Sequence, residues 1–330
     1  MGAVAEHDNA AGVQPALVIG GPTASGKTGL AISLAQRLGG DVINGDAFQL
    51  YAGLPVLTAQ PSAAQRGLVP HHLFGETPLN TSVDASSYAR LAKDRIRLCW
   101  KLGRPPILVG GSGLYLRTVL RGLPQGLPSP DLDLRARLEA RPLRDLCAEL
   151  AALDPEAARK VDVQNPRRVI RALEVCLLTG KAFSSFRAPP MAEAPLAGIW
   201  LAIPRETLHK RIALRAAGLF AEGVAAEVQA ALPLLGPTAR QVIGLEQVAS
   251  VLAGKNSEQA ATLKIVEATR QYARRQETWF RKETVLAPTA SEAALEEALR
   301  IAEQRADKRY AGNGGLSETT DPSCKKPSSA

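Results

Sequence analysis

A glycine-rich loop near the start of the chain carries the clearest chemical signature. It fits the pattern G-x-x-x-x-G-K-[ST] and consists of Gly21, Pro22, Thr23, Ala24, Ser25, Gly26, Lys27 and Thr28. In such a loop, backbone N–H groups converge on phosphate oxygens at the positive end of a helix, and the lysine adds a charge. The hydroxyl of Thr28 offers the kind of oxygen ligand that Mg²⁺ prefers. The loop therefore predicts a phosphate site with magnesium as cofactor; the alternative is a plain glycine turn beside a buried lysine.

The segments around this loop predict how it is held. An apolar stretch at 16–19 precedes it, and apolar residues at helical spacing follow it up to Leu38. Three more apolar stretches, at 41–44, 106–109 and 198–203, are each followed by a helical pattern. This alternation is typical of an α/β fold, and we predict a P-loop NTPase-like parallel sheet flanked by helices.

Ligands of such sheets bind at the carboxyl ends of the strands, so polar residues there are candidates for chemistry. Asp46 follows the second strand as a possible general base or magnesium ligand, or as a turn aspartate. The third strand ends in Gly-Gly-Ser112 and not in the aspartate of a Walker B strand, which argues against a motor or switch NTPase. On the helix after the fourth strand, Arg211 and Arg215 share one face, where either can reach a phosphate or simply remain solvated.

The middle of the chain has a different texture. A Pro/Gly-rich linker after Arg121 leads into two short helical patterns rich in Arg and Glu. We expect a helical insertion domain at 121–164 and a helix from Pro166 to Thr179 that returns to the core. The expected organisation is a disordered segment 1–15, a core of 16–120 and 165–310, the insertion, and a disordered tail 311–330.

A stretch near the C-terminal end interleaves arginines with aromatic residues. Arg270, Arg274 and Arg281 lie on one helical stripe, and Ile265, Tyr272 and Trp279 lie on a more apolar one. The formal net charge is +8, which favours a polyanionic partner such as nucleic acid, although a solvated basic surface is the alternative. Glu277 offers the arginines ordinary surface pairs instead.

Other classes of protein are disfavoured. No stretch approaches the roughly 20 apolar residues of a membrane-spanning helix, and the first residues lack the basic start of a secretory signal, so the cytoplasm is the expected location. The 4 cysteines are widely spaced and the 4 histidines include an adjacent pair, so neither a zinc site nor a disulfide framework is indicated.

Taken together, these segments resemble a known family. The stretches that carry the resemblance, in order, are the loop Gly21–Thr28, Asp46-x-x-Gln49-x-Tyr51, His71-His72-Leu73, Val109-Gly-Gly-Ser-Gly-Leu-Tyr115, Arg171-Ala-Leu-Glu-Val175, Ile243-Gly244 and Gln271-Tyr-Ala-Arg-Arg-Gln-x-Thr-Trp-Phe-Arg281. Over about residues 16–285 the chain resembles the bacterial tRNA dimethylallyltransferases, also called tRNA isopentenyltransferases.

The resemblance implies transfer of a dimethylallyl group from dimethylallyl diphosphate to the exocyclic amine of the adenosine 3′ to the anticodon of tRNA. It implies that the loop cradles the diphosphate, that Thr28 helps to hold Mg²⁺ and that Asp46 acts as the base. Ser112, where the family usually has threonine, would contact the substrates, and Arg215 would bind the diphosphate. The implied tRNA contacts are Gln49, Tyr51, Arg270, Arg274, Arg275 and Arg281, and the family is usually monomeric.

The chain departs from the family pattern at several positions. Ala47 replaces a common serine, Ala52 and Gln60 replace basic residues, and Leu245-Glu246-Gln247 replaces Tyr-Lys-Glu. Three alternatives remain at this stage: an adenylate isopentenyltransferase that acts on free nucleotides, a small-molecule P-loop kinase, and an RNA-binding protein with a vestigial loop.

Overall fold

The computed structural model describes residues 16–122, 124, 126–186 and 196–313. The segments 1–15 and 314–330, which the sequence predicts to be disordered, lie outside these residues. Helix α14 (Ala294–Asn313) extends the folded part to Asn313, so the start of the expected disordered tail at 311 is helical instead.

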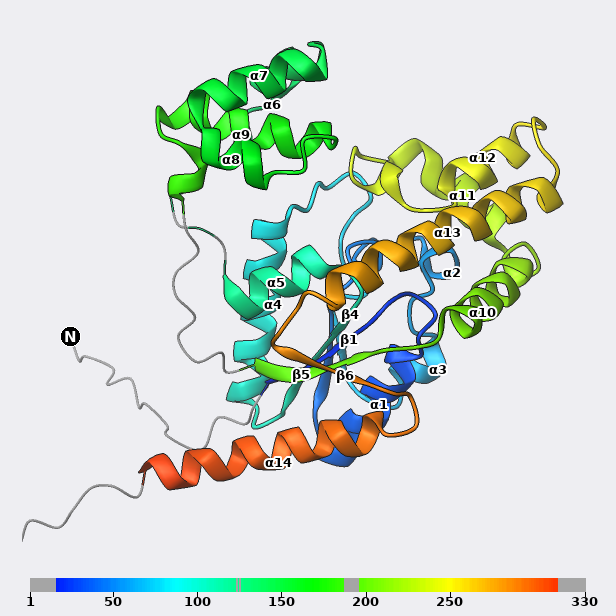
Figure 1. The fold of residues 1–330 in the computed structure, drawn as a ribbon. Coiled ribbons are helices and arrows are strands. Elements are labelled where there is room, and N and C mark those ends of the chain that lie inside the picture. Colours follow the sequence, from blue (N-terminus) through cyan, green and yellow to red (C-terminus); the bar gives the residue numbers. More distant parts are fainter. Residues whose placement is uncertain (1–15, 123, 125, 187–195, 314–330) are drawn as a thin grey trace, which may run out of the picture. The chain divides into compact units, whose positions relative to one another are not determined.

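The described chain contains a sheet of six parallel strands in the order β3-β2-β4-β1-β5-β6 (Figure 1). The strands are β1 (Ala16–Gly20), β2 (Asp41–Asn44), β3 (His71–His72), β4 (Pro106–Gly110), β5 (Leu196–Leu201) and β6 (Leu286–Thr289). This confirms the predicted α/β class with a parallel sheet and flanking helices. The fourth predicted strand begins two residues earlier than expected, at Leu196 instead of Gly198.

Strands β3 and β6 form the two edges of the sheet and were not anticipated from the sequence. β3 is only two residues long, too short for a hydrophobic period to show. β6 contains Pro288, which cannot donate a ladder hydrogen bond and is tolerated at an edge. Both strands therefore depend on pairing with a neighbour and carry little local signal.

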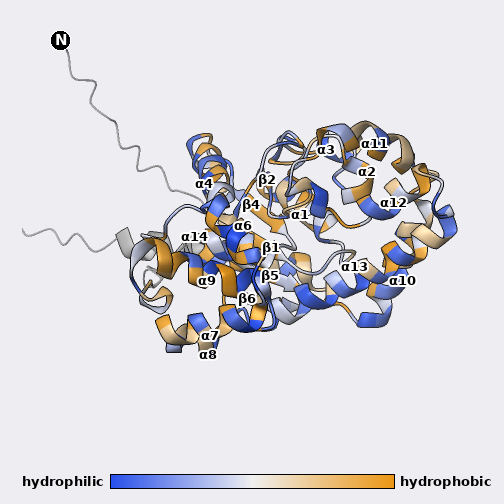
Figure 2. Cartoon of the chain, turned by 90° about the horizontal axis from the view of Figure 1, so that it is seen from above, coloured by the Kyte–Doolittle hydropathy of each residue, from blue (hydrophilic) through white to orange (hydrophobic). Residues whose placement is uncertain are grey.

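The helices of the sheet-containing part follow the strands. They are α1 (Lys27–Leu38), α2 (Pro55–Thr58), α3 (Ala63–Arg66), α4 (Ala85–Lys101), α5 (Gly113–Arg121), α10 (Arg205–Gly218), α11 (Val224–Ala231), α12 (Leu245–Leu252), α13 (Glu258–Phe280) and α14. In Figure 2, helices such as α10 alternate hydrophilic and hydrophobic residues, as expected for helices with one buried face.

The alternation of side chains along the strands creates two helical layers. Leu17 and Ile19 of β1 and Val42 of β2 pack in one apolar cluster with residues of α1 and α14. Asp41, whose side chain points to the opposite face of β2, contacts Cys99 of α4. Helices α1 and α14 therefore cover one face and α4 the other, while α10 to α13 share a second cluster beside the sheet.

The chain divides into two compact units. Residues up to Leu116 and from Pro195 onward form the first, and Arg117–Ala194 form the second. The second unit contains α6 (Leu132–Glu139), α7 (Leu143–Leu153), α8 (Pro155–Lys160) and α9 (Pro166–Thr179). The bounds of α9 and its left-handed cap at Gly180 match the prediction.

The place of α9 differs from the sequence-based expectation. Val169, Ile170 and Leu173 of this helix pack against Leu146 and Leu150 of α7, so α9 belongs to the second unit and does not return to the sheet core. The unit also has a polar anchor, because the fully buried Glu174 accepts hydrogen bonds from Arg135 and from Arg171. Ionic partners hold the pKa of Glu174 low against the opposing effect of burial.

No helix in the described ranges combines the length and apolar character that crossing a bilayer requires.

The register between β1 and β5 generates a stability prediction. A Cβ atom added at Gly198 would lie 1.9 Å from the backbone oxygen of Val18, the residue opposite it. Gly198→Ala must therefore displace one of the central strands, and we expect it to lower the free energy of unfolding by about 3 kcal/mol, as overpacking does. Gly67→Ala is the matched control, since its Cβ has 3.5 Å of clearance and its φ is −71°. Urea unfolding monitored by circular dichroism measures both; equal midpoints would contradict the proposed close approach.

Candidate active site

The glycine loop joins β1 to α1, in the strand–loop–helix context that the motif requires. Gly21 and Gly26 have φ values of 145° and 93°, which side chains rarely adopt, and Gly26 caps the N-terminus of α1. Ala24 also has a positive φ of 63°, so the loop holds strained backbone. Lys27 folds back over it, and Nζ donates a hydrogen bond to the carbonyl oxygen of Pro22 at 2.7 Å.

A cavity of about 330 Å³ opens over this loop at the carboxyl ends of the strands. Its polar wall includes Thr23, Lys27, Thr28, Asp46, Gln49 and Arg215. Its apolar wall includes Phe48, Leu57, Ile212, Leu219, Val242 and Ile265. The sequence predicts that the glycine loop, Asp46 and the residues after the fourth strand lie at the carboxyl ends of the strands, and all three contribute to this cavity. The apolar wall could not be identified from the sequence, because its members come from five separate segments.

Opposite charges share this cavity. Burial raises the pKa of the Asp46 carboxyl above its usual range, and the positive charge of Lys27 opposes that rise. Burial lowers the pKa of Lys27 to about 8, although Asp46 counteracts this effect and Arg215 adds to it. The pKa of Arg215 is also lowered by burial. The cavity thus holds one desolvated carboxylate next to two desolvated cations. Their positive charge exceeds the negative charge of Asp46, and an anionic ligand would balance it.

The turn that carries Asp46 is fixed by hydrogen bonds from three directions. The side chain of Asn44 accepts from the Asp46 N–H at 2.8 Å and donates to the Leu73 carbonyl oxygen at 2.9 Å. Ser112 Oγ accepts from the Ala47 N–H at 2.9 Å. Ser112 Oγ also lies 3.4 Å from the hydroxyl of Tyr272, which lines the cavity, so Ser112 positions the Asp46 turn at the cavity edge, and its expected contact with the substrates stays a prediction.

Two arginines of α10 reach the glycine loop. Arg215 Nη1 donates to Thr23 Oγ1 at 3.3 Å, and Arg211 Nη1 lies 3.3 Å from the Ser25 carbonyl oxygen. Arg215 lines the cavity, whereas Arg211 is exposed. The geometry therefore favours Arg215 over Arg211 as the arginine for a bound phosphate.

The side chains expected next to Asp46 have structural partners. Gln49 Nε2 donates to the carbonyl oxygens of Thr58 and Ala59, which fixes the α2 segment of the cavity wall. Tyr51 is only 2% exposed and packs in the cluster beneath α10 to α13. The expected tRNA contact by Tyr51 is therefore corrected, because a side chain buried in this way does not reach a macromolecular ligand.

Helix α13 presents two faces. Ile265, Thr269 and Tyr272 line the cavity at a spacing that keeps them on one side of the helix. The four arginines expected to contact tRNA, Arg270, Arg274, Arg275 and Arg281, are all exposed. Arg281 donates to Glu277 at 2.5 Å, the surface pair that the sequence offered as an alternative, and Arg275 lies over the Tyr272 ring at 5.8 Å.

Gln276, on the cavity-facing side of α13, connects the two glycine-containing turns. Its Oε1 accepts from the Thr23 N–H at 2.8 Å, and its Nε2 donates to the Gly111 carbonyl oxygen at 2.9 Å. The side chain is 4% exposed, so these backbone groups have little access to water as a substitute. Sequence reasoning missed this role; the signal was its place one turn after Tyr272 on the apolar stripe of the helix.

These two hydrogen bonds form a bridge between the turns, and they predict that Gln276 sets the geometry of the phosphate loop. Gln276→Leu keeps most of the volume but removes both hydrogen bonds, so the Thr23 N–H loses its orientation. We expect affinity for inorganic diphosphate to fall about 10-fold or more, consistent with an unsatisfied buried donor costing about 1–3 kcal/mol. Isothermal titration calorimetry with Mg²⁺ present measures the change.

Gln271→Leu on the same helix is the matched control, because Gln271 is exposed and its side chain bonds only weakly, to Glu267 at 3.5 Å. Its diphosphate affinity should equal that of the unchanged protein. Equal affinities for both variants would show that the bridge does not organise the loop.

Comparisons with known proteins agree with this geometry. The IPP transferase family profile matches residues 49–283. The tRNA dimethylallyltransferase of Streptomyces coelicolor is 42% identical over 274 residues, which cover 81% of this chain and 87% of that protein. The tRNA isopentenylpyrophosphate transferase structure from Bacillus halodurans superposes with a TM-score of 0.67 at 30% identity, covering 91% of this chain and 99% of that one. A eukaryotic dimethylallyltransferase acting on tRNA shares the fold, with a TM-score of 0.71 at 24% identity over 93% of this chain and 81% of that one. The chain therefore belongs to the IPP transferase family.

Proposed function

We propose that this protein transfers a dimethylallyl group from dimethylallyl diphosphate to the N6 amine of the adenosine 3′ to the anticodon in tRNA. The observation that carries the proposal is the single cavity in which Asp46 faces a phosphate loop beside an apolar wall. The loop and the base alone would also suit a kinase, so the choice between the two reactions depends on the family and on the transfer assay below. The family membership and the names of the relatives support the same reaction.

The polar wall suits the diphosphate. The allylic C–O bond breaks, its electron pair leaves with the diphosphate oxygen, and the developing negative charge needs compensation. Lys27, Arg215 and the N–H groups at the start of α1 are placed to supply it. Since Lys27 and Arg215 are partly desolvated before the ligand arrives, their attraction for the departing anion is stronger than it would be in water.

The apolar wall suits the five-carbon group. Leu57, Ile212, Leu219, Val242 and Ile265 surround space beside the loop, where the prenyl chain would exclude water from the reacting carbon. This exclusion matters because water would compete with the adenine amine for an allylic cation. We assign these residues to the dimethylallyl group.

Asp46 suits the role of base. The N6 amine forms the new C–N bond and loses a proton, which passes to the Asp46 carboxylate. The raised pKa of Asp46 makes it a better proton acceptor than an ordinary carboxylate. The hydrogen bonds of Asn44 and Ser112 to its turn keep the carboxylate in place while the substrate enters.

Magnesium fits the oxygen donors of the polar wall. Among the described residues, the cavity lining offers the Thr28 hydroxyl and the Asp46 carboxylate but neither sulfur nor imidazole, and Mg²⁺ prefers such hard oxygen ligands. We assign Thr28 as the protein ligand. When bound, Mg²⁺ would neutralise charge on the diphosphate.

The exposed arginines of α13 support tRNA as the acceptor. Arg270, Arg274 and Arg275 project from the helix whose other face lines the cavity, so a phosphodiester backbone held there lies close to the reaction site. The target adenosine must leave its stack to reach Asp46, as for other base-modifying enzymes. We expect a monomer, as the family resemblance implies, and a tRNA substrate would place the reaction in the cytoplasm.

The first test is a transfer assay with radiolabelled dimethylallyl diphosphate, Mg²⁺ and either unmodified tRNA or AMP. We expect label in tRNA and not in AMP. Asp46→Asn should lower kcat at least 100-fold, within the range of roughly 10² to 10⁴ for loss of a general base. The matched control Asp94→Asn, whose carboxylate pairs with Arg97 on the surface, should leave kcat unchanged.

Label in AMP alone would move the protein to the adenylate isopentenyltransferases. No label in either acceptor, together with ATP-dependent phosphorylation of a metabolite, would replace the proposal with the kinase.

The lowered pKa of Lys27 predicts a basic limb in the pH profile. Lys27 loses its charge as the pH rises through about 8, so kcat/KM for dimethylallyl diphosphate should fall above that pH. In kcat the limb should move to higher pH, because the bound diphosphate stabilises the charged amine. Lys27→Arg keeps a permanent charge and should lose the limb, whatever its overall activity. A limb that stays at about pH 8 in this variant would belong to another group.

A further inference from the structure

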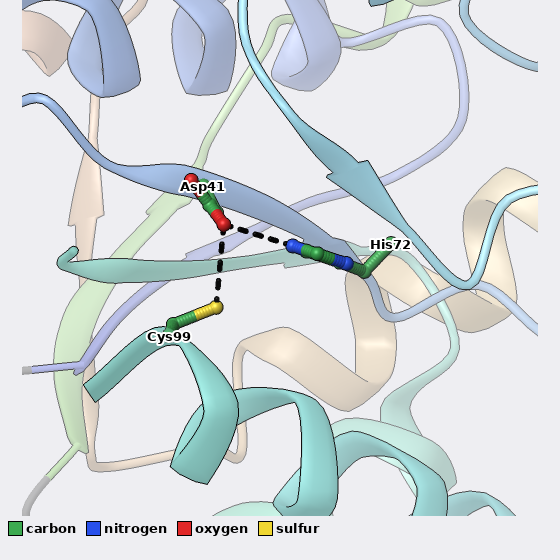
Figure 3. Close-up of side chains that lie close together, drawn as sticks. All are labelled: Asp41, His72 and Cys99. Atoms are coloured by element: carbon green, nitrogen blue, oxygen red, sulfur yellow. Dashed lines mark hydrogen bonds and ion pairs between the residues drawn. The ribbon is translucent and has the colours of Figure 1, made fainter. Parts of the chain in front are cut away.

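A second cluster of reactive side chains lies at the end of β2 opposite to Asp46. Asp41 begins β2, His72 ends β3 and Cys99 lies in the last turn of α4 (Figure 3). His72 Nε2 is 2.9 Å from Asp41 Oδ2, and Cys99 Sγ is 3.7 Å from the same oxygen. The three atoms lie within 4.8 Å of one another, and Asp41 and Cys99 are buried.

The hydrogen bonds within this cluster leave part of the aspartate unsatisfied. Asp41 is 1% exposed, and its Oδ1 accepts no hydrogen bond from the described residues. The cation nearest to that oxygen among the described ion pairs is Arg104 Nη1, at 3.7 Å. Buried carboxylate oxygens normally have a partner, so the cluster has capacity for a further positively charged ligand.

The donor set and the spacing are those of a transition-metal site. Zn²⁺ binds cysteine sulfur, histidine nitrogen and carboxylate oxygen at about 2.0–2.3 Å in a tetrahedron, which separates the ligand atoms by roughly 3.5 Å. The observed separations range from 2.9 Å up to a limit of 4.8 Å, on both sides of this value. Side-chain adjustments of less than about 1 Å would therefore complete three of the four positions.

We propose that Asp41, His72 and Cys99 bind one Zn²⁺ or similar thiophilic divalent cation, at a site separate from the active-site cavity. The carboxylate and the thiolate balance the charge of the ion, and Asp41 Oδ1 or a water molecule takes the fourth position. Binding displaces the proton of the Cys99 thiol into solution, so affinity increases with pH.

The position of the site indicates a structural role. The ion would join β2, β3 and α4, and these segments meet again at the other end of β2, at Asn44, three residues after Asp41. There, Asn44 donates to the Leu73 carbonyl oxygen, and Tyr88 of α4 donates to the Asn44 carbonyl oxygen at 2.9 Å. A metal bound at Asp41 would join these segments at the end of β2 where, among the described residues, Asp41 Oδ1 has no hydrogen-bond partner.

Cobalt provides the test, because Co²⁺ replaces Zn²⁺ in such sites and a thiolate ligand gives it a near-ultraviolet charge-transfer band. The full chain, freed of metal with a chelator, is titrated with CoCl₂ and then with ZnCl₂. We expect the band to saturate at one equivalent and to be lost on addition of ZnCl₂, while excess MgCl₂ leaves it unchanged. Oxygen-only binding of Co²⁺ at the phosphate loop does not produce this band.

Variants locate the ligand. Cys99→Ser should abolish the band, and the matched control Cys147→Ser, which removes a half-buried thiol of the second unit, should retain it. His72→Gln should keep the thiolate but weaken Co²⁺ binding about 100-fold or more, by analogy with the losses caused by disturbing metal-site partners. Circular dichroism verifies that each variant is folded.

The absence of a charge-transfer band in the unchanged protein would overturn the proposal, and this result does not depend on any variant folding. A band that persists in folded Cys99→Ser would overturn it as well.

Discussion

A carboxylate and two cations share one partly desolvated cavity, and the rest of the sheet-containing unit serves to hold them there. Burial alone would discharge Asp46 and Lys27, while their mutual attraction keeps both ionic forms accessible. Neither group is left in an ordinary state, which is typical of sites where charge develops during a reaction. The arrangement requires that separate segments of chain approach one another to within hydrogen-bonding distance.

Glycines that let two backbone segments touch make this approach possible. A Cβ atom at Gly110 would lie 2.1 Å from the Gly45 carbonyl oxygen, so only glycine lets the ends of β2 and β4 meet. Gln276 then ties the phosphate loop to the turn after β4, and Ser112 ties that turn to Ala47. The hydrogen bonds of Gln276 and Ser112 therefore position the phosphate loop and the Asp46 turn relative to each other.

In the proposed function, helix α13 links the chemistry to the acceptor. One face closes the cavity with Ile265, Thr269 and Tyr272, and the other exposes arginines to solvent. With these two faces, the helix would couple the position of a bound polyanion to the position of the reacting groups. Strand β2 likewise contributes to two clusters, since Asp46 follows its last residue and the buried Asp41 is its first.

The sequence by itself determined the parallel α/β fold and the phosphate-loop motif, because local periodicity and motif spacing encode them, and its resemblance to known motifs indicated the family. It also predicted α9 to the residue through its proline start and glycine cap. Only the tertiary structure decided the edge strands, the membership of α9 in the second unit, the burial of Tyr51, the bridge of Gln276 and the apolar wall. The Asp41–His72–Cys99 cluster belongs with these, since no spacing in the sequence indicated it. Each of these features depends on contacts between residues far apart in the chain, and such contacts leave no period or motif in the sequence.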